Sequence, residues 1–217
     1  MKGYKIIYVF DALCSWCYGF SPVIKTLFET YQDKFEFEVI SGGMILGDRA
    51  GPIGEVASYI NSSYKNIEST TGIKFGKAFL THLEKGAMRF SSEKPAIALS
   101  VFKSFQPERA VVFAHDLQQS IYFDGKDPNH NELYRYLAVN FGIDPDEFEK
   151  KLMFEEYHNA AYYDFALAKQ LQVESYPAVL LQESESKFYL LAKGYTDFET
   201  LGLRITNILE EITSKTK

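Results

Sequence analysis

The chain has 217 residues and a mass of 24.8 kDa, enough for one large domain or two small ones. Hydrophobic residues make up 46% of it and charged residues 24%, which excludes disorder, collagen and coiled coil as descriptions of the whole chain. The net charge of −6 argues against nucleic-acid binding, because phosphate contacts need clustered lysine and arginine.

The first fifth of the chain predicts a strand, a helix and a second strand. Residues 4–10 are nearly all apolar, as expected of a strand that is covered on both faces. Residues 14–31 carry apolar side chains at helical spacing, and residues 35–39 alternate apolar residues with glutamate before a turn at 41–43. This order predicts a parallel pair of strands joined by a right-handed crossover.

The middle of the chain, residues 52–157, predicts helices and no convincing strand. Apolar residues recur there every three or four positions, and segments with glycine and proline separate the stretches. A helix predicted over 158–171 is followed by strands at 176–181 and 187–192 and by a last helix around 201–212. The predicted order is therefore βαβ, a helical block, and then αββα.

The N-terminal segment indicates a cytoplasmic protein. Its apolar run, residues 6–10, is too short for a signal peptide and lacks a small-residue cleavage pattern. No stretch approaches the ~20 apolar residues of a membrane span. The chain has two cysteines, fewer than a secreted disulfide scaffold would have. We expect no membrane partner, and the sequence leaves the oligomeric state open.

The two cysteines stand where the first predicted strand passes into the first helix, as Cys14-Ser15-Trp16-Cys17. A helix that begins near Cys14 offers free N–H groups and the positive end of its dipole, which favour a thiolate. Cys17 lies one turn further along, at a separation that suits a disulfide. We therefore expect Cys14 to be the exposed attacking sulfur and Cys17 the shielded sulfur that resolves a mixed disulfide.

Three other interpretations of the cysteine pair are weaker. A structural disulfide that closes so small a loop would restrict the unfolded chain only slightly. Two inert core cysteines would not need to stand at a strand-to-helix junction. A zinc site would need two further ligands, and we expect no metal, because none of the four histidines forms a tight pair: His82, His115, His130 and His158.

The nine residues 14–22, Cys-Ser-Trp-Cys-Tyr-Gly-Phe-Ser-Pro, resemble the active-site segment of cytoplasmic DsbA-family proteins, the FrnE-like predicted protein-disulfide isomerases. Residues 118–127, ending Tyr-Phe-Asp-Gly-Lys-Asp, are similar to the helix-and-loop insert of that family. The resemblance implies an α/β chain with a thioredoxin-like domain from residues 1–47 and 158–217. It implies an inserted all-helical domain, residues 48–157, between the βαβ and ββα halves.

The resemblance also implies which residues form the rest of the site. Pro177 would be the family's cis proline facing the cysteines, although the sequence alone supports only a proline that opens a strand. The backbone of Tyr176 would then be free to pair with an extended substrate. Trp16 is a candidate hydrophobic lip for substrate, with a packing role as the alternative. Asp11 is a candidate proton acceptor for Cys17, although its position favours a turn.

Three other positions carry structural expectations. Pro22 should kink the first helix. The Gly42-Gly43 pair should form a plain turn, with a close backbone approach to the site as the alternative. His115 lies off the apolar stripe of its helix, so we expect it to be exposed.

The cysteine pair and the resemblance together predict a thiol–disulfide oxidoreductase of the protein disulfide reductase or isomerase type. Its partners would be protein or peptide thiols and disulfides, and it would need no cofactor beyond glutathione as a candidate reductant. Because Ser15 and Trp16 bring no positive charge between the cysteines, we expect a weak oxidant. One alternative is a DsbA-like adaptor or redox-sensing binding protein. Another is a glutathione-linked transferase or isomerase of the kappa or hydroxychromene-carboxylate type, whose members carry serine where Cys14 stands.

Overall fold

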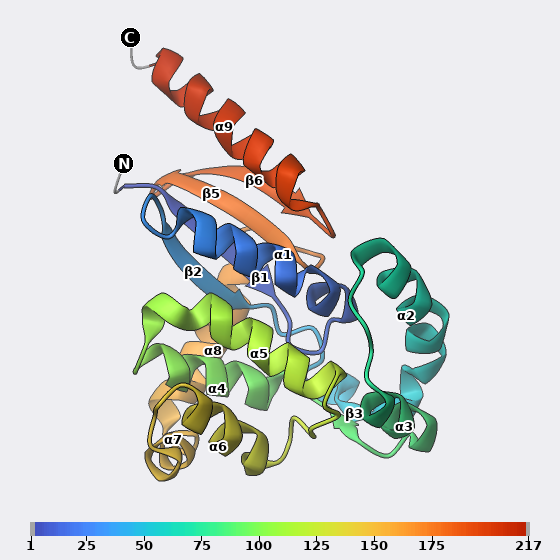
Figure 1. Cartoon of the computed structure of the whole chain (residues 1–217). Helices are drawn as coiled ribbons and strands as arrows, with labels where there is room; N and C mark the ends of the chain where they lie inside the picture. Colours follow the sequence, from blue (N-terminus) through green and yellow to red (C-terminus); the bar gives the residue numbers. More distant parts are fainter. Residues whose placement is uncertain (1–2, 216–217) are drawn as a thin grey trace.

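A computed structural model describes residues 3–215 of the chain. A four-stranded sheet with the order β2-β1-β5-β6 forms its centre (Figure 1). β1 (Lys5–Phe10) pairs in parallel with β2 (Glu36–Ser41), as predicted for the first two strands. β5 (Ala178–Ser184) lies antiparallel to β1 and to β6 (Lys187–Lys193), so the sheet is mixed.

Some of the described helices pack on this sheet and the others form a block beside it (Figure 1), and most of them come from the middle of the chain. In chain order they are α1 (Ser15–Tyr31), α2 (Ala57–Thr71), α3 (Lys77–Lys85), α4 (Glu93–Lys103), α5 (Ala110–Tyr122), α6 (Asn131–Asn140), α7 (Pro145–Lys151), α8 (Glu155–Gln170) and α9 (Phe198–Lys215). Short 3-10 turns connect some of them: η1 (Gly47–Arg49), η2 (Ile53–Glu55) and η3 (Pro107–Arg109).

The helical block also contains a small sheet that the sequence did not predict. β3 (Gly51–Pro52) pairs antiparallel with β4 (Arg89–Phe90). The expectation of no strand between residues 52 and 157 is therefore wrong at this place. Strands of two residues are too short to leave an alternating pattern in the sequence.

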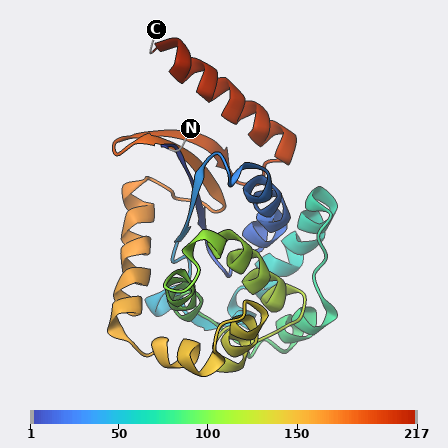
Figure 2. The same ribbon diagram turned by 60° about the vertical axis from the view of Figure 1, so that its left-hand side comes forward.

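Helices cover both faces of the sheet. Figure 2 shows α8 along one face, with α1 and α5 on the other. Ile7 and Val9 of β1 pack on the α8 side, against Ala168. Tyr8 and Phe10 point to the opposite side and join the larger core with α1. Burial on both faces explains why the sequence of β1 is a continuous apolar run.

The expected division into two domains stays a prediction. The four-stranded sheet, α1 and α9 come from the two ends of the chain, and the remaining helices come from between them. The expected boundary at residues 157/158 falls inside α8. One buried hydrophobic cluster runs from β1 and α1 into α4, α5 and α6, so the sheet and the helical block share a core.

A proline sets the start of β5, whereas the proline of α1 does not end that helix. β5 begins at Ala178, later than predicted, because Pro177 has no N–H to give to the sheet. Pro22 lies inside α1, which continues beyond it to Tyr31.

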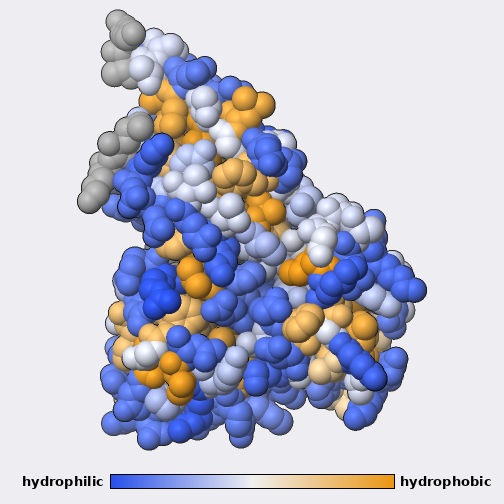
Figure 3. Space-filling model, in the orientation of Figure 1, coloured by the Kyte–Doolittle hydropathy of each residue, from blue (hydrophilic) through white to orange (hydrophobic). Residues whose placement is uncertain are grey.

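Hydrophilic residues cover much of the face seen in Figure 3, where apolar residues show as separate patches. No helix within residues 3–215 combines the length and apolarity needed to cross a bilayer.

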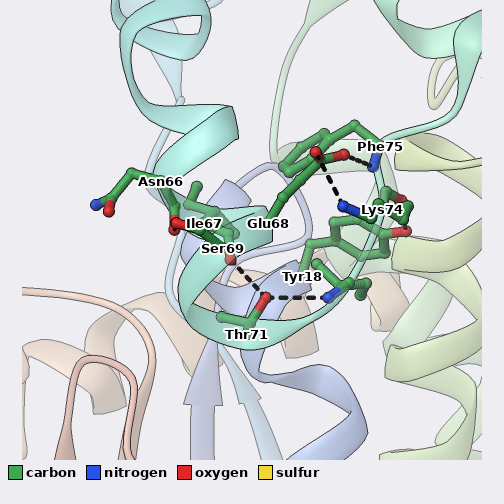
Figure 4. Close-up of polar contacts among 9 residues, drawn as sticks. Tyr18, Asn66, Ile67, Glu68, Ser69, Thr71, Lys74 and Phe75 are labelled. Carbon is green, nitrogen blue, oxygen red and sulfur yellow. Dashed lines mark hydrogen bonds and ion pairs between the residues drawn. The ribbon is translucent and has the colours of Figure 1, made fainter.

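The C-terminal end of α2 packs against α1 (Figure 4). The hydroxyl of Tyr18 donates a hydrogen bond to the carbonyl of Lys74 at 2.8 Å, and the ammonium of Lys74 lies 3.4 Å from the Glu68 carboxylate. A Cβ added to Gly19 would lie 2.8 Å from the Ile67 side chain, so this glycine lets α1 and α2 approach closely. The N-terminal end of α2 then lies beside the start of α1.

Candidate active site

Cys14 is the N-cap residue of α1, where the sequence predicts the helix to begin. Its backbone is extended, and its sulfur accepts a hydrogen bond from the N–H of Cys17 at 3.3 Å. Both cysteines are free thiols in this structure. The Cys14 sulfur therefore lies at the positive end of the α1 dipole, within hydrogen-bonding reach of an N–H group of the first turn.

Cys14 is more accessible than Cys17, which is the order that the sequence predicts. Cys17 is fully buried, and Cys14 is 7% exposed. The expectation that Cys14 is exposed is wrong, because side chains from the start of α2 and from the loop after β2 gather around it. Burial raises the pKa of the Cys17 thiol well above its usual value, and the neighbouring Cys14 raises it further. Cys17 therefore keeps its proton at neutral pH.

The segment before β5 lies against Cys14. The Cys14 thiol donates a hydrogen bond to the Tyr176 carbonyl at 3.6 Å. The Tyr176–Pro177 peptide bond is cis. Pro177 is buried, and its carbonyl accepts a hydrogen bond from the N–H of Gly194 at 2.8 Å. The fold thus brings together residues from the two ends of the chain.

The Tyr176 ring lies on the backbone of Gly42. Its hydroxyl donates to the Gly42 carbonyl at 2.8 Å, and a Cβ added to Gly42 would lie 2.2 Å from two ring carbons. The alternative reading of the glycine pair, a close approach at the site, therefore holds for Gly42, while Gly43 has a φ of +67° that suits a turn. Burial raises the pKa of Tyr176 to about 12, so its hydroxyl remains protonated.

Asp11 ties three segments together just before the cysteines. Its buried carboxylate accepts hydrogen bonds from the N–H of Leu13 at 2.9 Å, the N–H of Met44 at 2.7 Å and the hydroxyl of Ser92 at 2.9 Å. The turn role expected for Asp11 is confirmed by the first of these bonds. Burial raises the pKa of Asp11, although these three donors and the N–H of Gly43 oppose it. Its charge also contributes to the raised pKa of Cys17.

A cavity of about 90 Å³ opens beside Cys14. Trp16 is half-buried and lines it. The other lining residues come from the active-site turn, the loop after β2, the start of α2 and β4: Leu13, Ser15, Met44, Ile45, Val56, Tyr59, Ile60 and Phe90. A mostly apolar lining next to a reactive sulfur suits an apolar group of a substrate.

Sequence reasoning missed three buried polar residues around the cysteines. Gln118 is fully buried, and its amide nitrogen lies against the carbonyl groups of the turn before α1. The hydroxyls of Tyr8 and Tyr122 are also buried; burial raises the pKa of both, and the cysteines raise it further. Tyr8 sits in an apolar run and Gln118 among other polar residues, so the sequence carried no signal of contact with the cysteines.

His115 is half-buried, and the expectation that it is exposed is wrong. Its Nδ1 lies 2.9 Å from the Ser21 hydroxyl of α1. α5 packs against both α1 and α4, so side chains outside its main apolar stripe are covered as well. Burial, aided by Lys25, lowers the pKa of His115 to about 4.

Within residues 3–215 no three His, Cys, Asp or Glu side chains are grouped so that they could hold a metal ion.

Comparison with known families identifies the fold. The family described as the DSBA-like thioredoxin domain matches residues 5–205. The chain belongs to this family. With two cysteines at the N-terminus of α1, this DsbA-like protein is a thiol–disulfide oxidoreductase at the level of the family. A search of curated proteins finds no match to the chain.

Solved structures share the whole architecture at low sequence identity. A candidate protein disulfide isomerase from Nitrosomonas europaea is 22% identical with a TM-score of 0.81, covering 96% of this chain and 98% of that one. The cytosolic disulfide reductase DsbM from Pseudomonas aeruginosa is 19% identical with a TM-score of 0.78, covering 94% and 98%. A 2-hydroxychromene-2-carboxylate isomerase is 12% identical with a TM-score of 0.62, covering 98% of each chain. These likenesses support the thioredoxin-like fold.

Proposed function

We propose that this DsbA-like protein reduces and rearranges disulfides of proteins or peptides through Cys14 and Cys17. The observation that carries the proposal is the position of the Cys14 sulfur. It lies at the N-terminus of α1, between the N–H of Cys17 at 3.3 Å and the carbonyl of Tyr176 at 3.6 Å. The first neighbour favours a thiolate, and the second offers backbone to a bound substrate.

The exchange would begin with attack of the Cys14 thiolate on one sulfur of a substrate disulfide. The substrate S–S bond breaks, one substrate sulfur leaves as a thiolate and takes a proton from solvent, and Cys14 remains in a mixed disulfide. Cys17 then loses its proton and attacks the Cys14 sulfur, which releases the second substrate thiol. Because burial raises the pKa of Cys17, this step needs a proton acceptor, and the buried carboxylate of Asp11 is our candidate.

Two molecules of glutathione would return the protein to its dithiol form. The first thiolate attacks the Cys14–Cys17 disulfide and forms a mixed disulfide, and the second releases oxidised glutathione from it. The similar protein DsbM has been solved with GSH and is described as cytosolic. We extend both properties to this chain as part of the proposal, with the cytoplasm as its location.

Substrate would contact the protein on two sides of Cys14. The Tyr176 backbone would pair with an extended substrate segment. The cavity beside Trp16 would hold an apolar side chain next to the substrate cysteine, because the cavity is about the size of a side chain and most of its lining is apolar.

Reduction of insulin disulfides by glutathione tests the proposal. We expect the wild-type protein to accelerate the reaction and Cys14→Ser to abolish the acceleration. Serine is a good N-cap residue, so this variant keeps the start of α1 intact. Wild-type rates equal to the uncatalysed background would contradict the proposal and favour an adaptor or a redox sensor. Turnover of a chromene carboxylate would instead favour the isomerase whose fold the chain shares.

A further inference from the structure

Gln118 connects the helical block to the turn that carries Cys14. It belongs to α5, and its Nε2 lies 3.2 Å from the carbonyl oxygen of Asp11 and 3.4 Å from those of Ala12 and Cys14. We propose that Gln118 is a positioning residue that holds these three carbonyl groups and thereby sets the reactivity of Cys14. The inference rests on the proposed function in taking Cys14 as the reactive sulfur.

The contacts fix the orientation of the Gln118 amide. An amide nitrogen carries two hydrogens, so the three carbonyl oxygens share them, in keeping with the rather long distances. The Asp11 carbonyl also accepts from the N–H of Cys14, and the Cys14 carbonyl from that of Tyr18, both at 3.0 Å. Within residues 3–215 the Ala12 carbonyl has Gln118 as its donor. Gln118 therefore adds to the bonds of the Asp11 carboxylate a second side chain that holds the turn.

The other end of the amide shows that Gln118 does more than fill the core. Its Oε1 is buried and has no donor among residues 3–215. A buried acceptor without a partner destabilises the fold. A methionine of similar length would fill the same space without that penalty. The contribution of the glutamine is therefore its amide nitrogen, which faces the turn.

The amide affects Cys14 in two ways. Cys14 is the N-cap residue, so the direction of the turn carbonyls decides how its sulfur meets the N–H of Cys17. The carbonyl oxygens of residues 11, 12 and 14 converge on the amide nitrogen of Gln118. The N–H groups of Gln118 offset their partial negative charge, which would otherwise disfavour a thiolate at Cys14. Without the amide the thiolate is less stable, so the reduced form is less stable and the oxidised form more populated.

Alkylation of Cys14 across a range of pH tests the inference. Gln118→Met removes the amide and keeps the length of the side chain. Gln119→Met is the matched control, because the Gln119 amide oxygen faces the Tyr18 hydroxyl instead of the turn. We expect Gln118→Met to raise the pH midpoint of iodoacetamide alkylation by about half to one unit, which corresponds to a roughly three- to tenfold smaller acid dissociation constant of the thiol. The control should keep the wild-type midpoint.

Equilibration with glutathione mixtures separates positioning from a purely structural role. Loss of packing destabilises the reduced and oxidised forms alike and leaves their ratio unchanged. We expect Gln118→Met to shift that ratio roughly three- to tenfold toward the oxidised form. Gln118→Asn keeps the amide on a side chain that is one carbon shorter, and it should shift both readouts in the same direction. It replaces Gln118→Met in the test if that variant does not fold.

A folded Gln118 variant with the wild-type midpoint and ratio would overturn the inference. An equal shift in Gln119→Met would overturn it too, because the effect would then belong to α5 in general. Both readouts use the full chain and need no protein substrate. A protein that fails to reduce insulin but shows the shift at Gln118 would therefore contradict the proposed function and leave the positioning role standing.

Discussion

Gly42→Ala tests whether the Tyr176 side chain fixes the backbone beside Cys14. The new Cβ would lie 2.2 Å from two carbons of the Tyr176 ring and 2.6 Å from its hydroxyl oxygen. Carbon atoms in contact are normally ~3.5–4.0 Å apart, so the ring has to move by about 1.3 Å or more. That displacement also breaks the 2.8 Å hydrogen bond from the Tyr176 hydroxyl to the Gly42 carbonyl.

The size of the effect follows from these two losses. Overpacking of this kind costs about 1–3 kcal/mol, and a lost hydrogen bond about 1 kcal/mol. We expect Gly42→Ala to lower the free energy of unfolding by about 2–4 kcal/mol. Gly42 is not among the glycines with positive φ, so backbone strain adds nothing. Because one ring causes the whole effect, Tyr176→Ala should remove most of it, with a coupling energy of about 2–3 kcal/mol.

Urea unfolding of the four members of this mutant cycle gives the coupling, and insulin reduction reports on the site. Gly42→Ala should lose both stability and activity, and the double variant should be about as stable as Tyr176→Ala alone. Gly202→Ala is the control, because a Cβ there meets only the Tyr31 hydroxyl at 3.5 Å. Strictly additive free energies in the cycle would refute the reasoning.

Burial holds the pKa of His115 at about 4, below that of an unfolded histidine. As the pH falls, the histidine is therefore protonated in the unfolded chain before it is in the folded one. Relative to His115→Gln, the wild type should lose about 1–2 kcal/mol of unfolding free energy between pH 7 and pH 5, measured by urea unfolding. Equal pH profiles of the two proteins would contradict this. In glutathione mixtures with the redox potential of cytosol, we expect most Cys14 to be a free thiol, as measured by the fraction that can be alkylated. A reduction potential as oxidising as that of periplasmic oxidases would refute the expectation based on Ser15 and Trp16. A peptide trapped on Cys14 should slow hydrogen exchange at the start of α2 and around Tyr176, and protection confined to α6 and α7 would place the substrate elsewhere.

The sequence predicted those parts of the site that depend on local chemistry. Residues 14–17 stand at a strand-to-helix junction, and this placement alone predicts the N-cap role of Cys14. The continuous apolar run of β1 predicts a strand buried on both faces, and the structure places helices on both sides. The order of strands and helices at the two ends of the chain followed from periodicity in the same way.

The long-range parts of the site left no local signal. Gln118 reaches the turn before Cys14 from more than a hundred positions away, and nothing in the sequence around it marks that contact. His115 was assigned to solvent because one apolar stripe was assumed for α5, whereas the helix is covered by two neighbours. The fit between Gly42 and Tyr176 likewise joins residues that only the fold brings together.

Trapping of a mixed disulfide tests most directly the central claim that Cys14 is the attacking sulfur. The reduced Cys17→Ser variant would be incubated with a peptide disulfide, and its intact mass and peptide map would be measured. We expect a stable adduct of one peptide on Cys14, rapid release in the wild type, and no adduct in Cys14→Ser on the same timescale. An adduct that forms on Cys17 of the Cys14→Ser variant as fast as on Cys14 would contradict the claim.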